Sequence, residues 1–289
     1  MPALRIVSDL HLGHPASSIR HAEEFLPLLE GCGKVLLNGD TVESCSAAMA
    51  GPSAAQFAVI ADWCRRQGVA LDLQPGNHDP DQPGPAWRSL DDGRIVVTHG
   101  DACFRFGSPW SPWARKLERR LLEVEAAFAA EARPDTLENR LELARRWSWV
   151  FYPRPRHFDG TLGKLETLWT AAWPPYAPLT ILRLWAQVPR IVSSWLARYA
   201  PDARVAVIGH THRAGIWHKD GRWVINTGAF HPFGTPRLVD WEPGRLVVRR
   251  IVRRGGLFRP GRVVAVLEQA GDRWERATRD GVTCLCASR

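Results

Sequence analysis

The sequence predicts a layered α/β fold, and two features of the chain lead to that prediction. Six short apolar runs rich in β-branched residues recur along the chain, and polar motifs follow at least five of them. A helical stretch over residues 54–67 fits between two of the early runs. Buried strands that end in turns and alternate with helices are typical of layered α/β architecture. The six runs are residues 4–7, 35–37, 69–73, 95–97, 205–208 and 223–225.

Two further apolar runs, over residues 238–241 and 246–252, predict a closing pair of antiparallel strands. The chain after residue 252 is basic and contains glycine at first, then becomes ordinary in composition. Residues 253–289 are therefore expected to be a C-terminal extension without a predicted role.

The segment over residues 108–200 differs from its surroundings and is expected to be a helical insertion. Residues 110–200 hold eight of the 14 tryptophans, and residues 105–200 carry 15 Lys plus Arg against 9 Asp plus Glu. Helices are predicted over residues 113–132 and 136–151. A third helix keeps an apolar face with a helical period and is expected to kink at Pro189. That face consists of Ile181, Leu184, Trp185, Val188, Val192, Trp195, Leu196 and Tyr199. We expect the segment to form a cap over the ends of the strands.

The bulk composition leaves several classes of partner open. The net charge of +8 and the isoelectric point near 9.6 are compatible with nucleic acid, anionic lipid or a phosphorylated small molecule. Residues 1–10 lack the apolar core of a signal peptide, and the six cysteines are scattered without a CxxC pair. No run reaches the roughly 20 apolar residues of a spanning helix. We therefore expect a cytoplasmic protein, with contact to the inner face of a membrane as an option.

Oxygen and imidazole donors stand at the ends of the predicted strands. They are Asp9, His11, Asp40, Asn77, His78, His99, His210 and His212. In α/β folds, loops at the carboxyl ends of strands gather at one edge, so these groups are expected to converge. Unpaired polar groups are costly to bury, and metal ions would resolve that cost. Two bridged cations can clamp a phosphoryl group and lower the pKa of a bound water. The mixed nitrogen and oxygen set suits Mn, with Fe, Zn, Co or Ni as alternatives.

Five short blocks carry these donors and follow one another between residues 9 and 212. They are Asp9-x-His11, Gly39-Asp40, Gly76-Asn77-His78-Asp79, His99-Gly100-Asp101 and Gly209-His210-Thr211-His212. In this order the blocks resemble the signature of the calcineurin-like metallophosphoesterases. The resemblance covers residues 3–107 and 203–252 and leaves the middle segment unaccounted for. It implies a four-layer αββα sandwich, with a catalytic domain formed by residues 1–107 and 201–252.

The resemblance also implies a role for each donor. Asp9, His11 and His212 would hold one metal ion, Asn77, His99 and His210 would hold a second, and Asp40 would bridge both. His78 would lie beside the phosphate, where it would stabilise charge or protonate the leaving oxygen. Asp79 would orient His78 by accepting its other ring N–H. A metal-bridging hydroxide would be the nucleophile, so no cysteine is required for catalysis.

Four functions remain open for such a centre. The chain is similar to the UDP-2,3-diacylglucosamine pyrophosphohydrolases of lipid A biosynthesis, which share the Asp-x-His and His-Gly-Asp blocks and a helical insertion before Gly-His-Thr-His. Their best-known members have arginine where this chain has His78. In this reading, acyl chains would lie among the tryptophans of the cap, and arginines would meet phosphates or anionic headgroups. The alternatives are a phosphomonoesterase or phosphodiesterase on a soluble metabolite or nucleotide, a nuclease, and a non-catalytic scaffold.

Overall fold

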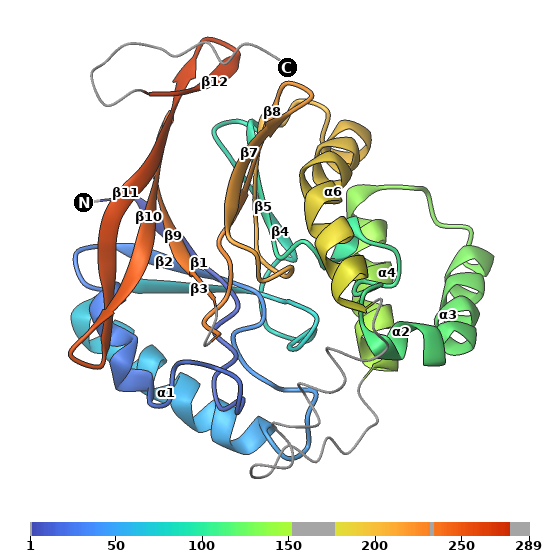
Figure 1. The fold of residues 1–289 in the computed structure, drawn as a ribbon, viewed down its shortest axis with the longest axis horizontal. Helices are drawn as coiled ribbons and strands as arrows, with labels where there is room; N and C mark the ends of the chain where they lie inside the picture. Colours follow the sequence, from blue (N-terminus) through green and yellow to red (C-terminus); the bar gives the residue numbers. More distant parts are fainter. Residues whose placement is uncertain (1, 152–176, 232–233, 278–289) are drawn as a thin grey trace.

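Two β-sheets face each other, and helices cover their outer faces, in the computed structural model of the protein (Figure 1). The structure describes residues 2–151, 177–231 and 234–277. The seven-stranded sheet, called sheet A, has the order β12-β11-β10-β9-β1-β2-β3. Its strands are β1 (Leu4–Val7), β2 (Lys34–Asn38), β3 (Ala70–Gln74), β9 (Arg237–Glu242), β10 (Arg245–Arg254), β11 (Leu257–Ala270) and β12 (Arg273–Arg276).

The five-stranded sheet, called sheet B, has the order β4-β5-β6-β8-β7. Its central strands β5, β6 and β8 are parallel, and β4 and β7 pair antiparallel at the two edges. In sheet A the neighbours β1, β2 and β3 are parallel in the same way. The strands of sheet B are β4 (Trp87–Leu90), β5 (Ile95–Thr98), β6 (Val205–Ile208), β7 (Gly215–Lys219) and β8 (Arg222–Asn226).

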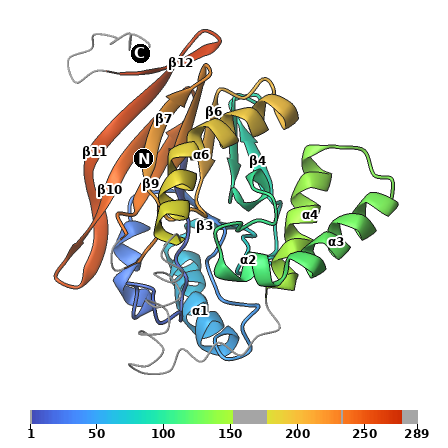
Figure 2. The same ribbon diagram turned by 45° about the vertical axis from the view of Figure 1, so that its right-hand side comes forward.

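Three apolar clusters separate the layers. The inner cluster lies between the sheets and contains Ile6 and Leu36 from sheet A with Val97 and Val207 from sheet B. The second cluster packs the helices before and after β2 against the outer face of sheet A. The third packs the remaining helices against the outer face of sheet B. Helix, sheet, sheet and helix therefore form four layers, which confirms the predicted fold class (Figure 2).

The helices follow the predicted positions closely. The segment predicted over residues 113–132 divides at Leu117 into two helices, and Pro189 lies inside the last helix as expected. The α-helices are α1 (Ala50–Gln67), α2 (Pro112–Lys116), α3 (Glu118–Ala130), α4 (Leu137–Val150) and α6 (Ala177–Tyr199). Short 3-10 helices are η1 (Ala22–Glu24), η2 (Leu26–Leu28) and η3 (Asp101–Cys103). None of the helices in the described part of the chain is long and apolar enough to cross a membrane.

Within the segment predicted to be a helical cap over residues 108–200, α4 and α6 form the outer layer of sheet B. Their apolar faces bury Trp147 and Val192 against Ile208 and Val224 of the sheet. An amphipathic helix buries its apolar stripe on whatever apolar face is available, and here that face is the outer side of sheet B. Residues 152–176 of the predicted cap lie outside the described residues.

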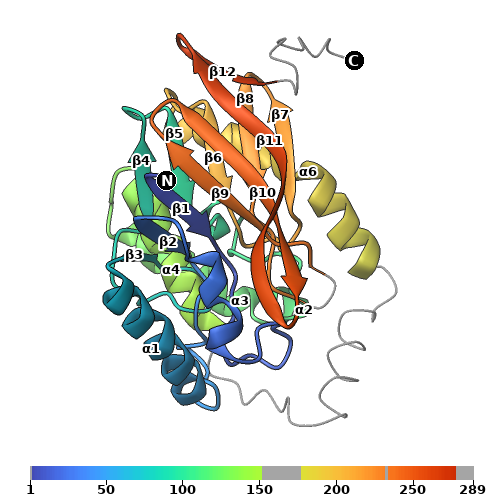
Figure 3. The ribbon, with the colours of Figure 1, turned by 90° about the vertical axis from the view of Figure 1, so that its left-hand side faces the viewer.

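The predicted C-terminal extension is in large part an integral element of sheet A. Strand β11 pairs with β10 along most of its length, and β12 pairs with the end of β11. Phe258 of β11 packs in the outer cluster, whereas Ala265 and Leu267 of the same strand pack in the inner cluster. The long hairpin therefore crosses from one core to the other (Figure 3).

Candidate metal centre

Five loops bring the predicted ligands together at the carboxyl ends of the parallel strands. Asp9 and His11 follow β1, Asp40 follows β2, and Asn77 and His78 lie in the loop after β3. These strands belong to sheet A. The remaining ligands, His99 after β5 and His210 and His212 after β6, come from sheet B. The candidate site therefore spans both sheets.

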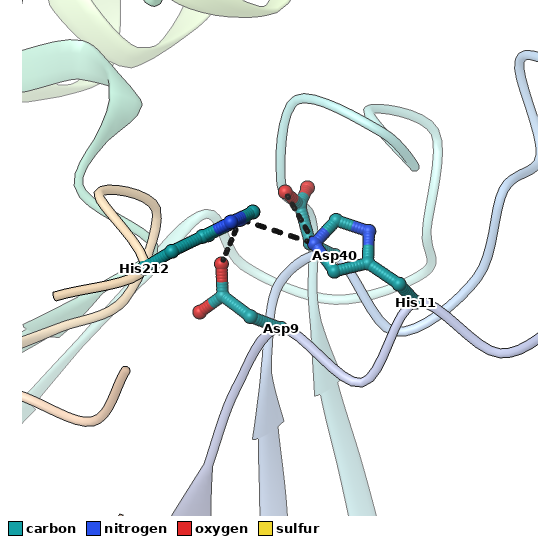
Figure 4. Close-up of side chains that lie close together, drawn as sticks. All are labelled: Asp9, His11, Asp40 and His212. Atoms are coloured by element: carbon teal, nitrogen blue, oxygen red, sulfur yellow. Dashed lines mark hydrogen bonds and ion pairs between the residues drawn. The ribbon is translucent and has the colours of Figure 1, made fainter. Parts of the chain in front are cut away.

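One group of ligands consists of Asp9, His11, Asp40 and His212 (Figure 4). One ligand atom from each residue lies within 4.8 Å of the others. The Nε2 atoms of His11 and His212 are 3.2 Å apart, and His212 Nε2 lies 3.4 Å from Asp9 Oδ1. His11 Nε2 lies 3.8 Å from Asp40 Oδ2. Two carboxylates and two imidazoles thus face a common point.

A second group shares Asp40 and adds His99 and His210. His99 Nε2 lies 3.3 Å from Asp40 Oδ2 and 3.3 Å from the amide oxygen of Asn77. The structure therefore gathers the seven residues predicted as ligands into two groups, with Asp40 common to both.

The hydrogen bonds around the histidines decide which ring nitrogen can bind a cation. His99 Nδ1 donates to the carbonyl oxygen of Asn38 at 3.1 Å, and His210 Nε2 donates to that of Gly107 at 3.0 Å. A carbonyl oxygen only accepts, so these nitrogens carry protons, and in the neutral ring the opposite nitrogen is the one that can bind a cation. His210 Nδ1 is buried and has no hydrogen-bond partner among the described residues. A buried lone pair that is left unsatisfied fits a metal ion, so this donor set suits the cations implied by the resemblance.

The backbone is strained at most of the proposed ligands. Asp9, His11, Asp40, His210 and His212 all have positive φ angles, between 48° and 66°. Residues other than glycine adopt this left-handed region only where the surrounding structure imposes it, and such residues cluster at functional sites. The strain supports a functional role for these five positions beyond that of turn formation.

Glycines in the blocks leave room for the ligands. A Cβ atom on Gly76 would collide with the Asp40 carboxylate, and one on Gly209 would collide with that of Asp9. Glycine is thus needed at positions 76 and 209, because at each position a ligand that follows a different strand occupies the space of a Cβ atom.

The charges and the burial of the site lower the pKa of the Asp40 carboxyl and shift the pKa values of His210 and His99 in opposite directions. Burial opposes ionisation of Asp40, but the charges of His99 and His78 hold the pKa of its carboxyl well below the usual range. Burial and the charge of His99 lower the pKa of His210 to about 3, so its imidazole is neutral at pH 7. Burial also opposes protonation of His99, yet Asp40 raises the pKa of that imidazole well above 6.5. A cation would displace this proton, since metal ligands bind in their deprotonated forms.

The structure gives Glu43 the role that was predicted for Asp79. His78 Nδ1 lies 2.8 Å from Glu43 Oε2, and the other oxygen of Glu43 lies 2.8 Å from His11 Nδ1. The Asp79 carboxylate instead accepts hydrogen bonds from the backbone N–H groups of Asp40, Thr41, Val42 and Gly76. Asp79 is fully buried and shapes the Asp40 loop, which explains why it does not face the His78 ring.

Replacing Glu43 by glutamine is expected to weaken both the metal ligand His11 and the proposed catalytic His78. The glutamine keeps the shape of the side chain but loses the carboxylate that accepts from both rings. Loss of such an orienting partner typically reduces metal affinity or activity about 10–100-fold. Metal titration by calorimetry and steady-state hydrolysis would measure the two effects separately. Glu23→Gln, an exposed carboxylate in η1, is the control and should change neither; unchanged metal affinity and turnover in Glu43→Gln would contradict the assignment.

Aromatic and basic side chains lie at the rim of the site; Trp185 belongs to the apolar helix face predicted from the sequence, whereas Arg213 was not singled out. The ring of Trp110 lies 5.0 Å from that of His210, and Trp185 Nε1 donates to the carbonyl oxygen of Thr211 at 3.1 Å. The Arg213 guanidinium lies 5.8 Å from the ring centroids of both Trp185 and Trp217. The tryptophan content of the helical segment and the basic residue next to His212 were the available signals.

Comparisons with known proteins give distant structural likenesses only. No family model matches the sequence, and no curated protein matches it. Vps29 from Entamoeba histolytica in complex with zinc is 12% identical, covers 90% of this chain and 97% of its own, and has a TM-score of 0.40. A predicted phosphoesterase from Streptococcus pneumoniae is 13% identical, with 90% and 96% coverage and a TM-score of 0.35. Phosphopantetheinyl hydrolase from Mycobacterium tuberculosis is 15% identical, with 88% and 97% coverage and a TM-score of 0.33. Likenesses at this level assign neither a family nor an activity to the chain.

Proposed function

We propose that the protein is a phosphohydrolase that works with two divalent cations bridged by Asp40. The observation that carries the proposal is the sharing of Asp40 between two groups of ligands, each completed by imidazole nitrogens with inward-facing lone pairs. A pair of cations would polarise a phosphoryl oxygen and lower the pKa of a coordinated water. Manganese is the first ion to test, because the ligands mix imidazole with carboxylate and amide oxygen.

The remaining chemistry belongs to side chains of the protein. The backbone N–H of His78 donates to Asp40 Oδ1 at 2.8 Å, which fixes the position of His78 relative to the bridging carboxylate. With Nδ1 held by Glu43, the ring would transfer a proton to the leaving oxygen through Nε2. Glu43 would stabilise the protonated ring of His78, because the Glu43 carboxyl stays ionised. Burial raises the pKa of this carboxyl, but the charge of His78 and the hydrogen bonds from His11 and His78 lower it by more. Asp79 would act through the backbone of the Asp40 loop.

The rim favours a substrate that carries an apolar group beside a phosphate. Arg213 is exposed next to His212, and it makes no hydrogen bond or ion pair with any described residue. Trp185 and Trp217 both lie near its guanidinium, so an anionic group and an apolar group could bind next to each other. This arrangement supports a lipid-linked pyrophosphate of the UDP-diacylglucosamine type, acted on at the inner face of a membrane. Packing of α4 and α6 on sheet B supports the alternative, a soluble phosphate ester, because burial of their apolar faces on the sheet leaves less apolar surface for acyl chains.

Hydrolysis assays on two substrates would decide between these classes. The manganese-loaded protein is assayed on bis-p-nitrophenyl phosphate and on a UDP-linked diacyl sugar in detergent, each against an EDTA control. We expect metal-dependent hydrolysis, with the lipid-linked pyrophosphate turned over faster. Arg213→Ala should then reduce activity on the lipid substrate about 10–150-fold and leave the small diester unchanged, since one charge-assisted contact contributes roughly 1.5–3 kcal/mol.

The results of these assays test the substrate class, the metal mechanism and the catalytic activity separately. Turnover of the small diester alone would reject the lipid-linked substrate while keeping the two-metal chemistry. Activity that persists after complete metal removal would reject the metal mechanism itself. Absence of any turnover in the metal-loaded protein, on these and other phosphate esters, would favour a non-catalytic scaffold.

A further inference from the structure

A groove with a volume of about 1810 Å³ opens between the two sheets. Strands β10, β11 and β12 of sheet A line one side, and β7 and β8 of sheet B line the other (Figure 1). Arg204, just before β6, and Trp223 of β8 belong to the groove, whereas His210 follows the opposite end of β6. The groove is therefore separate from the candidate metal centre and does not enter the proposed function.

Positive charge dominates the lining of the groove. Eight arginines and four acidic residues line it among the described residues, and only one of these acids, Glu268, forms an ion pair with a lining arginine, Arg245. Such an excess of one charge in a concave surface focuses the electrostatic field and attracts anions. The groove therefore forms a local basic surface at a distance from the proposed catalytic site.

Several of these arginine side chains lack a polar partner among the described residues. The guanidinium groups of Arg237, Arg250, Arg262 and Arg273 make no hydrogen bond or ion pair with the residues that the structure describes. Arg237 and Arg250 are direct neighbours across β9 and β10. Like charges directly opposite each other destabilise a sheet, so a role outside folding is needed to explain them. Burial and the positive charges of Arg250 and Arg276 lower the pKa of the Arg237 guanidinium, as expected where compensating carboxylates are scarce.

Aromatic rings accompany the arginines. The rings of His218 and Trp223 are 4.7 Å apart, and both residues line the groove. His218 is exposed and Trp223 is half-buried, so part of this ring pair is accessible. A basic groove that contains aromatic faces is the usual arrangement for single-stranded nucleic acid, because phosphates pair with arginine while bases stack on the rings.

We infer that the groove between the sheets binds single-stranded nucleic acid, with its phosphates on Arg237, Arg250, Arg262 and Arg273. An acidic peptide would also find positive charge there, but it would leave the accessible rings of His218 and Trp223 without a stacking partner. The nucleic acid uses both features of the groove.

The test measures binding of a fluorescein-labelled oligothymidylate of 20 nucleotides by anisotropy, across a series of NaCl concentrations. The groove variant is R250E/R262E/R273E, in which all three residues are exposed and away from the metal centre. The matched control is R190E/R254E/R259E, which makes the same change of net charge at exposed arginines outside the groove. Integrity of the oligonucleotide is checked on a gel.

The groove variant should bind at least about tenfold more weakly at low salt. Each lost phosphate contact lowers the slope of log K against log salt by about 0.7 for single strands, so the slope should fall by about 2. The control should bind within about twofold of the parent protein. Equal weakening of both variants would show a non-specific charge effect and overturn the inference, as would unchanged binding in the groove variant.

Two further measurements keep the inference independent of the proposed function. Polyglutamate that displaces the oligonucleotide at equal concentration of charge would overturn the assignment in favour of an acidic protein partner. Metal-dependent hydrolysis of bis-p-nitrophenyl phosphate should be unaffected in the groove variant. If neither the parent protein nor the variant hydrolyses the diester, the UDP-linked diacyl sugar or any other phosphate ester, the proposed function fails, but the binding comparison still decides the role of the groove.

Discussion

Replacing Asp40 by asparagine is expected to reduce metal-dependent phosphodiester hydrolysis more than about 10³-fold, because bridged cations supply both the activated water and the stabilisation of charge. Asp40 is the residue common to both ligand groups, and it is buried with a relative exposure of 1%. The asparagine retains the oxygen that can accept from the backbone N–H of His78. The variant therefore tests the bridging charge with little change of shape.

Metal content measured by mass spectrometry should fall from two ions per chain to one or none in Asp40→Asn. Asp202→Asn, at an exposed acidic residue after α6, is the control and should retain both ions and full activity. Thermal unfolding with and without manganese adds a second reading, because a ligand that binds only the folded state raises the melting temperature. Two tightly bound ions in Asp40→Asn would contradict the assignment of Asp40 as the bridge.

Replacing His78 by alanine is expected to reduce turnover about 10²–10⁴-fold and to leave metal binding intact, as for the loss of a general acid. The His78 ring packs edge-on to His11 at 4.7 Å, but His78 belongs to neither of the two ligand groups that share Asp40. Metal binding and turnover should consequently separate in this variant, whereas they fall together in Asp40→Asn.

The way in which the activity loss of His78→Ala depends on the leaving group tests the role of His78 more directly. A substrate with a good leaving group, such as p-nitrophenolate, needs little protonation and should lose less activity than an alkyl ester. His21→Ala removes an exposed histidine at the start of η1 and serves as the control. Turnover equal to that of the parent protein on both esters would reject the role proposed for His78.

The strands that position the site could be predicted from the sequence because they are short and largely apolar, and β1, β5 and β6 are fully buried. Strands β1 and β6 have the predicted bounds, and β2, β3, β5 and β8 begin or end within one residue of them. The edge strands β4 and β7 were missed, since their half-exposed residues lack an apolar run. Strand β11 was missed because Pro260 and Gly261 interrupt its sequence. Pro260 lies beside a register shift and beyond the part of β11 that pairs with β12, where a proline is tolerated.

The candidate site was predictable to the extent that its residues stand in recognisable blocks. The blocks identified the residues that form the two ligand groups, but they could not show which carboxylate contacts His78. Glu43 lies three residues after Asp40 and outside any block, whereas Asp79 is adjacent to His78 in sequence. The direction of each side chain depends on how the loops after β2 and β3 pack together, and this packing is a tertiary property.

The joining of both sheets at one centre has a consequence for the order of folding. His11 and His212 are separated by 201 residues, yet their ring nitrogens are in contact. During synthesis from the N-terminus, Asp9, Asp40 and His99 are present in the growing chain long before His210 and His212 are added. Contacts between such distant residues form late, because closing the intervening chain opposes them entropically. A complete pair of cation sites would therefore arise only in chains whose sheets have already assembled, and hydrolytic activity would report the fraction of fully folded molecules.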